Sequence, residues 1–74
     1  MATISKAFGK TMRHRRQKLG LSQEALAELA DIHRTYVSSL ELGKVGAGID
    51  VLYKIARALK IPLSRLIREA EKYI

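Results

Sequence analysis

The sequence predicts an all-α protein built from five short helices. Apolar residues recur three and four positions apart in five stretches, which is the spacing of one buried face on a helix. Glycine, proline or a capping residue separates successive stretches, and no stretch shows the alternation of a strand. A chain of 74 residues is expected to form one domain over residues 1–74.

The first helix is expected over about 3–19. An apolar stripe runs along it, formed by Ile4, Phe8, Met12 and Leu19, with Ala7 beside it. Gly20 is suited to the left-handed conformation that ends many helices. Arg15 stands where the stripe favours an apolar residue, so its stem should lie against the core while its guanidinium reaches water or phosphate.

The second and third helices are expected over about 23–30 and 34–42. Ser22 is a suitable N-cap, and Asp31 tolerates the left-handed conformation of a tight turn between the two helices. His33 is the expected, though weaker, cap of the third helix. The inward positions are assigned to Leu26, Ala27, Leu29, Ala30, Val37 and Leu40.

The fourth and fifth helices are expected over about 50–59 and 63–72. A loop with three glycines precedes the fourth helix, and Pro62 separates it from the fifth. The fourth helix should turn Leu52, Ile55, Ala56 and Leu59 inward. The apolar residues of the fifth helix are Leu63, Leu66, Ile67 and Ala70.

Charge and composition narrow the classes of function. The chain carries 14 Lys and Arg against 7 Asp and Glu, and its basic residues concentrate in 10–18 and 54–72. Such a surface is either a solvated face or one that attracts nucleic acid or an anionic membrane. There is no cysteine, no apolar run of about 18 residues and no signal-peptide core, so we expect a cytoplasmic protein without a membrane span.

Enzymatic and metal chemistry find little support. The acidic residues form no obvious pairs, no phosphate-binding glycine motif occurs, and His14 and His33 have no plausible partner ligands. We therefore expect no catalysis, no cofactor, no metal and no small-molecule ligand.

The third helix presents Arg34, Thr35, Ser38 and Ser39 on the face that has no core role. A guanidinium can bond guanine O6 and N7 together, and hydroxyl side chains can meet base edges or a thymine methyl. These four residues are the candidates for base contacts by a helix in the major groove of double-stranded DNA. The alternatives are a phosphate contact or a solvated charge for Arg34, and small spacers for the rest.

A distributed set of residues resembles a known family over residues 8–67. The matching elements are Gly20-Leu21-Ser22-Gln23-Glu24, Leu26-Ala27, Ile32, Val37-Ser38, Leu40-Glu41, Gly43-Lys44 and Ile61-Pro62-Leu63-Ser64. They resemble the XRE/Cro/lambda-repressor-type helix-turn-helix family. The resemblance implies a compact five-helix lambda-repressor-like DNA-binding fold, with the helix-turn-helix at 23–42. The chain length and the segment from His33 to Ser38 are also similar to controller proteins of restriction-modification systems.

The sequence departs from the family pattern at three places. Asp31 replaces a usual glycine, Gly46-Ala47-Gly48 replaces a more rigid segment, and Arg15 replaces an apolar residue. The fold should survive these changes, while the glycine-rich loop should be looser than usual and its phosphate contacts less secure.

The resemblance also implies roles for polar residues around the helix pair. Gln23 would bond a DNA phosphate and brace the recognition helix, and Arg16 would form an ion pair with Glu41. Further candidates for contacts to the DNA backbone are Ser22, His33, Tyr36, Lys44, Arg13 and Arg15. The alternative for each of them is an ordinary surface residue, and for Tyr36 a place in the core.

The C-terminal helix carries more apolar surface than a monomer core of this size requires. We expect it to form a two-fold interface together with the fourth helix or the loop before it. The residues assigned to the interface are Tyr53, Leu66, Ile67, Ala70, Tyr73 and Ile74. The alternative is that Leu66 and Ile67 only close the monomer core.

The sequence therefore predicts a homodimeric, sequence-specific regulator of transcription that binds a palindromic operator in double-stranded DNA. On the narrower resemblance, the regulated genes are those of a restriction-modification system. Two alternatives remain open, namely a DNA-binding antitoxin and a basic module that binds a protein or a membrane surface.

Overall fold

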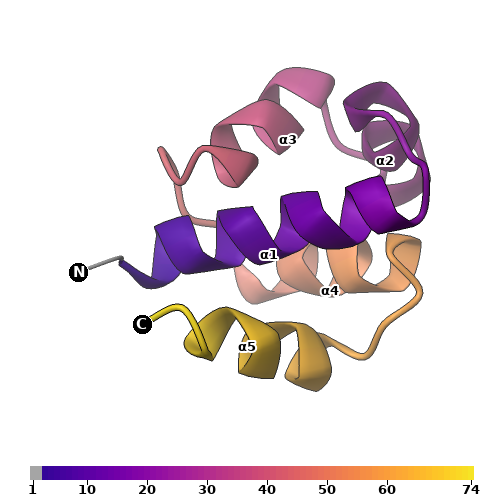
Figure 1. The fold of residues 1–74 in the computed structure, drawn as a ribbon. Coiled ribbons are helices and arrows are strands. Elements are labelled where there is room, and N and C mark those ends of the chain that lie inside the picture. The colour runs from indigo at the N-terminus through magenta and orange to yellow at the C-terminus, as the bar shows by residue number, and fades with distance from the viewer. Residues whose placement is uncertain (1–2) are drawn as a thin grey trace.

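In the computed structural model, which describes residues 3–74, the chain forms five α-helices (Figure 1). They are α1 (Ile4–Lys18), α2 (Gln23–Ala30), α3 (Arg34–Glu41), α4 (Ile49–Ala58) and α5 (Leu63–Glu71). Each helix ends within one residue of its predicted limits, and the all-α prediction is confirmed. No helix among the described residues is both long and apolar enough to cross a membrane.

Helix α1 is the centre of the arrangement. It packs against α3 and against α5, while α2 packs against α3 and α4, and α4 packs against α5. Figure 1 shows α3 and α5 on opposite sides of α1. The helices enclose one core, whose largest fully buried side chains are Met12, Leu26, Ile55, Leu59, Leu66 and Val37. The outer surfaces of α3 and α5 therefore belong to different parts of the molecule.

Local signals in the sequence account for the helix ends. Gly20 follows α1 with a φ of 71°, and Asp31 ends α2 with a φ of 55°, so both adopt the predicted left-handed conformation. The hydroxyl of Ser22 accepts a hydrogen bond of 3.0 Å from the backbone N–H of Ala25, as an N-cap does. These residues set the direction in which the chain enters and leaves α2.

Three apolar residues assigned to buried faces are on the surface. Ile4 is 50% exposed, Leu19 is 36% exposed and Leu29 is 61% exposed. The first two lie at the ends of α1, where fewer neighbouring elements cover a helix. In α2 the buried face is formed by Leu26, Ala27 and Ala30, and Leu29 lies more than a quarter-turn from its centre.

A close approach between α1 and α3 depends on Gly9. A Cβ atom built there would clash with the backbone oxygen of Leu40 and would lie 2.6 Å from the backbone oxygen of Glu41. Only a glycine lets the two backbones come this near. This glycine therefore sets how closely the end of α3 approaches α1.

Candidate nucleic-acid interface

The turn between α2 and α3 fixes the relative direction of the two helices. The backbone N–H of Ile32 donates to the oxygen of Ala27 at 3.0 Å, and that of Asp31 donates to the oxygen of Glu28 at 3.2 Å. This pattern is that of a Schellman closure. His33 caps α3 without a side-chain hydrogen bond, and Ile32 packs partly buried against the core. The result is a helix-turn-helix.

Helix α3 divides its residues between the core and the solvent. Val37 and Leu40 are buried, at 0% and 3% exposure. Arg34 and Thr35 are exposed, and Ser38 and Ser39 are half-buried. These last four are the sequence-predicted base readers, and helical spacing puts them on one side of α3. The guanidinium of Arg34 makes no hydrogen bond or ion pair within residues 3–74.

A polar network joins α1, α2 and α3 at the C-terminal end of α3. Arg16 and Glu41 form a bidentate pair, with Nε to Oε2 at 2.7 Å and Nη2 to Oε1 at 3.0 Å. Their side chains are 11% and 2% exposed. Arg16 Nη1 also donates to the oxygen of Leu21 at 2.8 Å, and Gln23 Nε2 donates to Glu41 Oε1 at 3.1 Å. Every buried side-chain donor and acceptor of this network therefore has a partner.

The network keeps the Arg16 charge in place. The hydrogen bond to Glu41 raises the pKa of the Arg16 guanidinium, and this effect outweighs the opposing effect of burial. A raised pKa favours the fold below the ordinary pKa of arginine, and that contribution disappears only as the pH rises through the higher folded value. The Arg16 guanidinium therefore remains charged at neutral pH.

Most of the remaining candidates for backbone contacts lie near the start of α2 or the ends of α3, and Arg13 lies on α1. Ser22, His33, Lys44 and Arg13 are exposed, and Gln23 and Tyr36 are half-buried. Gln23 donates one amide N–H to Glu41, and the amide has a second N–H. An anion at the N-terminus of α2 would meet that donor together with the positive end of the helix dipole.

Arg15 has a different partner from the one expected. Its side chain is half-buried, as the snorkelling interpretation requires, but Nε donates to the backbone oxygen of Leu59 at 3.1 Å and Nη2 donates to that of Lys60 at 3.4 Å. The guanidinium thus binds two backbone carbonyl oxygens at the C-terminal end of α4, where a helix leaves such groups without intrahelical partners. These two bonds leave three N–H donors of the guanidinium, so a contact of Arg15 to the DNA backbone stays a prediction.

The assignment of two residues to a dimer interface is wrong. Leu66 and Ala70 are both 0% exposed, because this face of α5 packs within the monomer against α1 and α4. The alternative for Leu66, that it closes the monomer core, is the correct one. Tyr53 is 53% exposed, and Tyr73 and Ile74 are 39% and 54% exposed, so these three remain available. Ile67 is half-buried.

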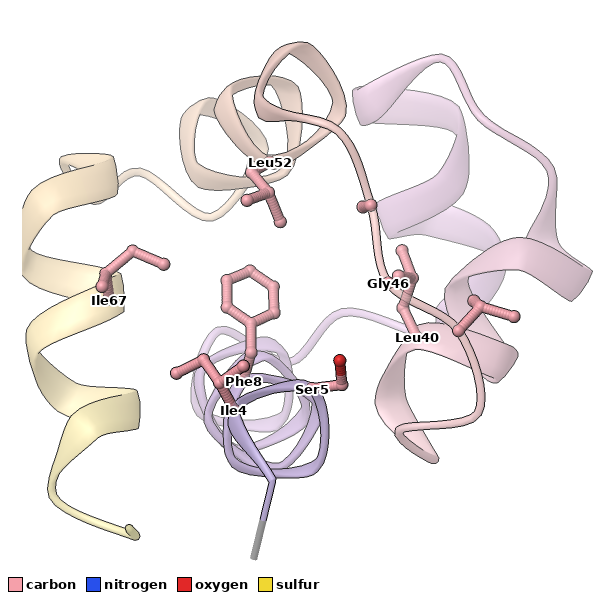
Figure 2. A pocket seen from close by; sticks show the side chains of 9 residues that line it. Ile4, Ser5, Phe8, Leu40, Gly46, Leu52 and Ile67 are labelled. Atoms are coloured by element: carbon pink, nitrogen blue, oxygen red, sulfur yellow. The ribbon is translucent and has the colours of Figure 1, made fainter.

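An apolar cavity of about 150 Å³ opens beside Ile67. In Figure 2, Phe8 of α1, Leu52 of α4 and Ile67 of α5 point toward one another. Ile4 and Val45 also line the cavity, and both are exposed. Neither of these two was expected at an interface, and neither was Ile49, which is 68% exposed. Val45 lies in the loop before α4, which was expected as an alternative part of the interface, although no residue of the loop was named.

Comparisons with known proteins agree with this geometry. A family model described as "Helix-turn-helix" matches residues 12–66. Control protein C.MunI from Mycoplasma sp is 41% identical over 73 residues, covering 97% of this chain and 99% of that protein. Control protein C.BamHI from Bacillus amyloliquefaciens is 42% identical over 55 residues, covering 73% of this chain and 68% of the relative.

Solved structures show the same arrangement of helices. The restriction-modification controller protein C.AhdI from Aeromonas hydrophila superposes with a TM-score of 0.81 at 38% identity, covering 82% of this chain and 92% of that one. The clp gene regulator ClgR from Corynebacterium glutamicum superposes with a TM-score of 0.93 at 25% identity, covering 97% and 77%. The chain therefore belongs to the helix-turn-helix family of the XRE type, as a DNA-binding transcriptional regulator of the restriction-modification controller type.

Proposed function

We propose that the protein is a cytoplasmic homodimer that reads a palindromic operator and regulates the genes of a restriction-modification system. Each protomer inserts α3 into the major groove of one half-site. Two recognition helices then sit about 34–36 Å apart, or a multiple of that distance, along the duplex. The observation that carries the proposal is the outward face of α3, where Arg34 and Thr35 are exposed on a helix whose other face is held in the core.

Base reading falls to the outward face of α3. Arg34 at the first turn is long enough to bond two acceptors of a guanine, whereas Thr35, Ser38 and Ser39 are short and let the helix approach the base edges. The polar network supports this role, because it ties the far end of α3 to α1 and to the start of α2. A reader whose position is fixed loses less entropy when it binds.

Phosphate contacts fall to the residues around α3. The second amide N–H of Gln23 and the N-terminus of α2 favour one phosphate, and the first N–H holds the recognition helix through Glu41. Ser22, His33, Tyr36, Lys44 and Arg13 are the other donors we assign to the backbone. Each cation that meets a phosphate releases counterions, so operator affinity should fall steeply with salt.

The exposed apolar surface supports a two-fold interface. Ile49 and Tyr53 are four residues apart and share one face of α4, and Ile67 lines the apolar cavity next to exposed Ile4 and Val45. A cavity near 150 Å³ is of the size that takes up a benzene-sized group. A side chain from a second copy fits this space, with Tyr73 and Ile74 at the margin. Leu66 and Ala70 take no part.

Selection from a pool of random duplexes tests the reading function, and sedimentation equilibrium tests the oligomer. We expect an inverted repeat to be enriched and the free protein to be a dimer at micromolar concentration. Ile49→Asp should shift the protein toward the monomer and thereby weaken operator binding. Lys54→Asp, at an exposed position of the same helix, should leave the protein a dimer. Equal affinity for scrambled duplexes, or binding only to anionic vesicles, would contradict the proposal.

A further inference from the structure

A second basic surface lies between α1 and α5. It is an open groove of about 520 Å³, whose lining includes His14, Arg15, Lys18, Arg65, Lys72 and Tyr73. Because α3 and α5 pack on opposite sides of α1, this groove is not part of the outward face of α3 (Figure 1). The two basic stretches of the sequence, 10–18 and 54–72, meet here although they are distant along the chain.

The groove has a marked excess of positive charge. Two arginines and two lysines line it, with a histidine, against one carboxylate from Glu69. That carboxylate is 3.4 Å from the Nε of Arg65, in a pair whose side chains are 68% and 38% exposed. A pair this exposed contributes little and leaves most of the charge uncompensated. Like charges gathered in one concave surface raise the local concentration of anions.

One of these cations is already held in position. Arg15 uses one N–H of Nε and one of Nη2 for the carbonyl oxygens of Leu59 and Lys60. A guanidinium has five N–H donors, so three remain without a partner among the described residues. An arginine that is fixed by backbone bonds loses little entropy when it meets an anion. The ring of Tyr73 adds an apolar wall, with Lys10 Nζ 4.9 Å from its centroid.

We propose that this groove binds a small, multiply charged phosphate anion of the nucleoside polyphosphate class. Phosphate suits the site because arginine donors and lysine charges are the groups that recognise it. A duplex bound along α3 would lie on the opposite side of α1 from this groove (Figure 1), so the groove is left for a different anion. The proposal does not depend on operator reading. It replaces the expectation of no small-molecule ligand, which rested on motifs and could not foresee a groove made by two distant helices.

Calorimetric titration with inorganic tripolyphosphate and with ATP, at about 0.15 M salt, tests the proposal without DNA. The double variant Arg65→Gln/Lys72→Gln removes two cations from the groove. Lys54→Gln/Arg68→Gln removes the same charge from exposed positions outside its lining. We expect tripolyphosphate affinity to fall about tenfold or more in the first variant and by less than about threefold in the second. Tighter binding of ATP than of tripolyphosphate would show that the nucleoside also contacts the protein.

A second readout uses the unaltered protein, so the proposal stays testable if a variant folds poorly. Amide NMR shifts on adding tripolyphosphate should concentrate in residues 11–18 and 65–73. Equal losses in the two double variants, shifts centred on 33–41, or displacement of tripolyphosphate by an equal concentration of polyglutamate would overturn the proposal. Both double variants should bind the operator with the same affinity. A failure of anion binding is therefore recognised separately from a failure of operator binding.

Discussion

Replacing Glu41 with glutamine should remove a large part of the stability of the fold. The carboxylate is 2% exposed and accepts two hydrogen bonds from Arg16 and one from Gln23. An amide has one acceptor oxygen, and its NH2 group would face the donors of Arg16. Leaving a buried guanidinium without its counter-charge costs about 3–5 kcal/mol. A domain of 74 residues has roughly 4–11 kcal/mol in total.

Thermal and urea unfolding followed by circular dichroism measure this cost. We expect a fall in the melting temperature of at least about 12 °C for Glu41→Gln. The matched control is Glu69→Gln, which breaks an exposed pair with Arg65 and should cost less than about 1 kcal/mol. A Glu41→Gln protein no less stable than the control would refute the reasoning.

A double substitution separates stability from function at the same site. Arg16→Met/Glu41→Leu removes both charges, so no buried charge is left alone, and most of the lost stability should return. The brace between Gln23 and α3 would still be absent, because it depends on the Glu41 carboxylate. We therefore expect a protein that is folded but binds its operator more weakly than the wild type.

Further predictions concern the reading face and three backbone positions. Arg34→Ala should relax the base preference at one operator position, at a cost of about 1–3 kcal/mol, which binding selection measures. Lys44→Ala should weaken binding to all duplexes alike and reduce its salt dependence, which a salt titration measures. Gly9→Ala should destabilise the protein by about 1–3 kcal/mol in urea unfolding despite the better helix propensity of alanine, because its Cβ meets backbone atoms of α3. Lys60→Gly should raise the free energy of unfolding by about 1 kcal/mol, because Lys60 has a φ of 58°, which strains a lysine but not a glycine. Asp31→Gly should give a smaller increase, because aspartate tolerates this conformation better. An unchanged Lys60→Gly melting curve would show that the left-handed residue carries no strain.

Structural features that depend on residues close together in the chain could be predicted from the sequence. The spacing of apolar residues indicated the five helices, Ser22 marked the start of α2, and Gly20 and Asp31 marked two of the four left-handed residues in the described part of the chain. The outward face of α3 also followed from spacing, because a helix of known ends has only one face free of core residues. The resemblance to a family rests on the same local signals, since many of its matching residues are caps, turns and core positions of the helix pair.

Features that depend on distant segments were not predictable. The partner of Arg15 lies 44 residues away in sequence, at Leu59. Gly9 shows its role only when α3 crosses α1, and the surface position of Leu29 depends on which side of α2 its neighbours cover. Leu66 and Ala70 cannot be separated from dimer residues by type, because apolar residues look alike in sequence whether they face the same chain or a second copy.

Within its eight residues, α3 keeps the residues that hold it in the core apart from those that face the solvent. Val37 and Leu40 hold the helix in the core, whereas Arg34 and Thr35 stand in solvent. On the proposed function, changes at Arg34 and Thr35 would alter which operator is bound and would leave the fold almost unaffected. A regulator built in this way can acquire a new target by drift at a few solvent positions, while its architecture persists unchanged.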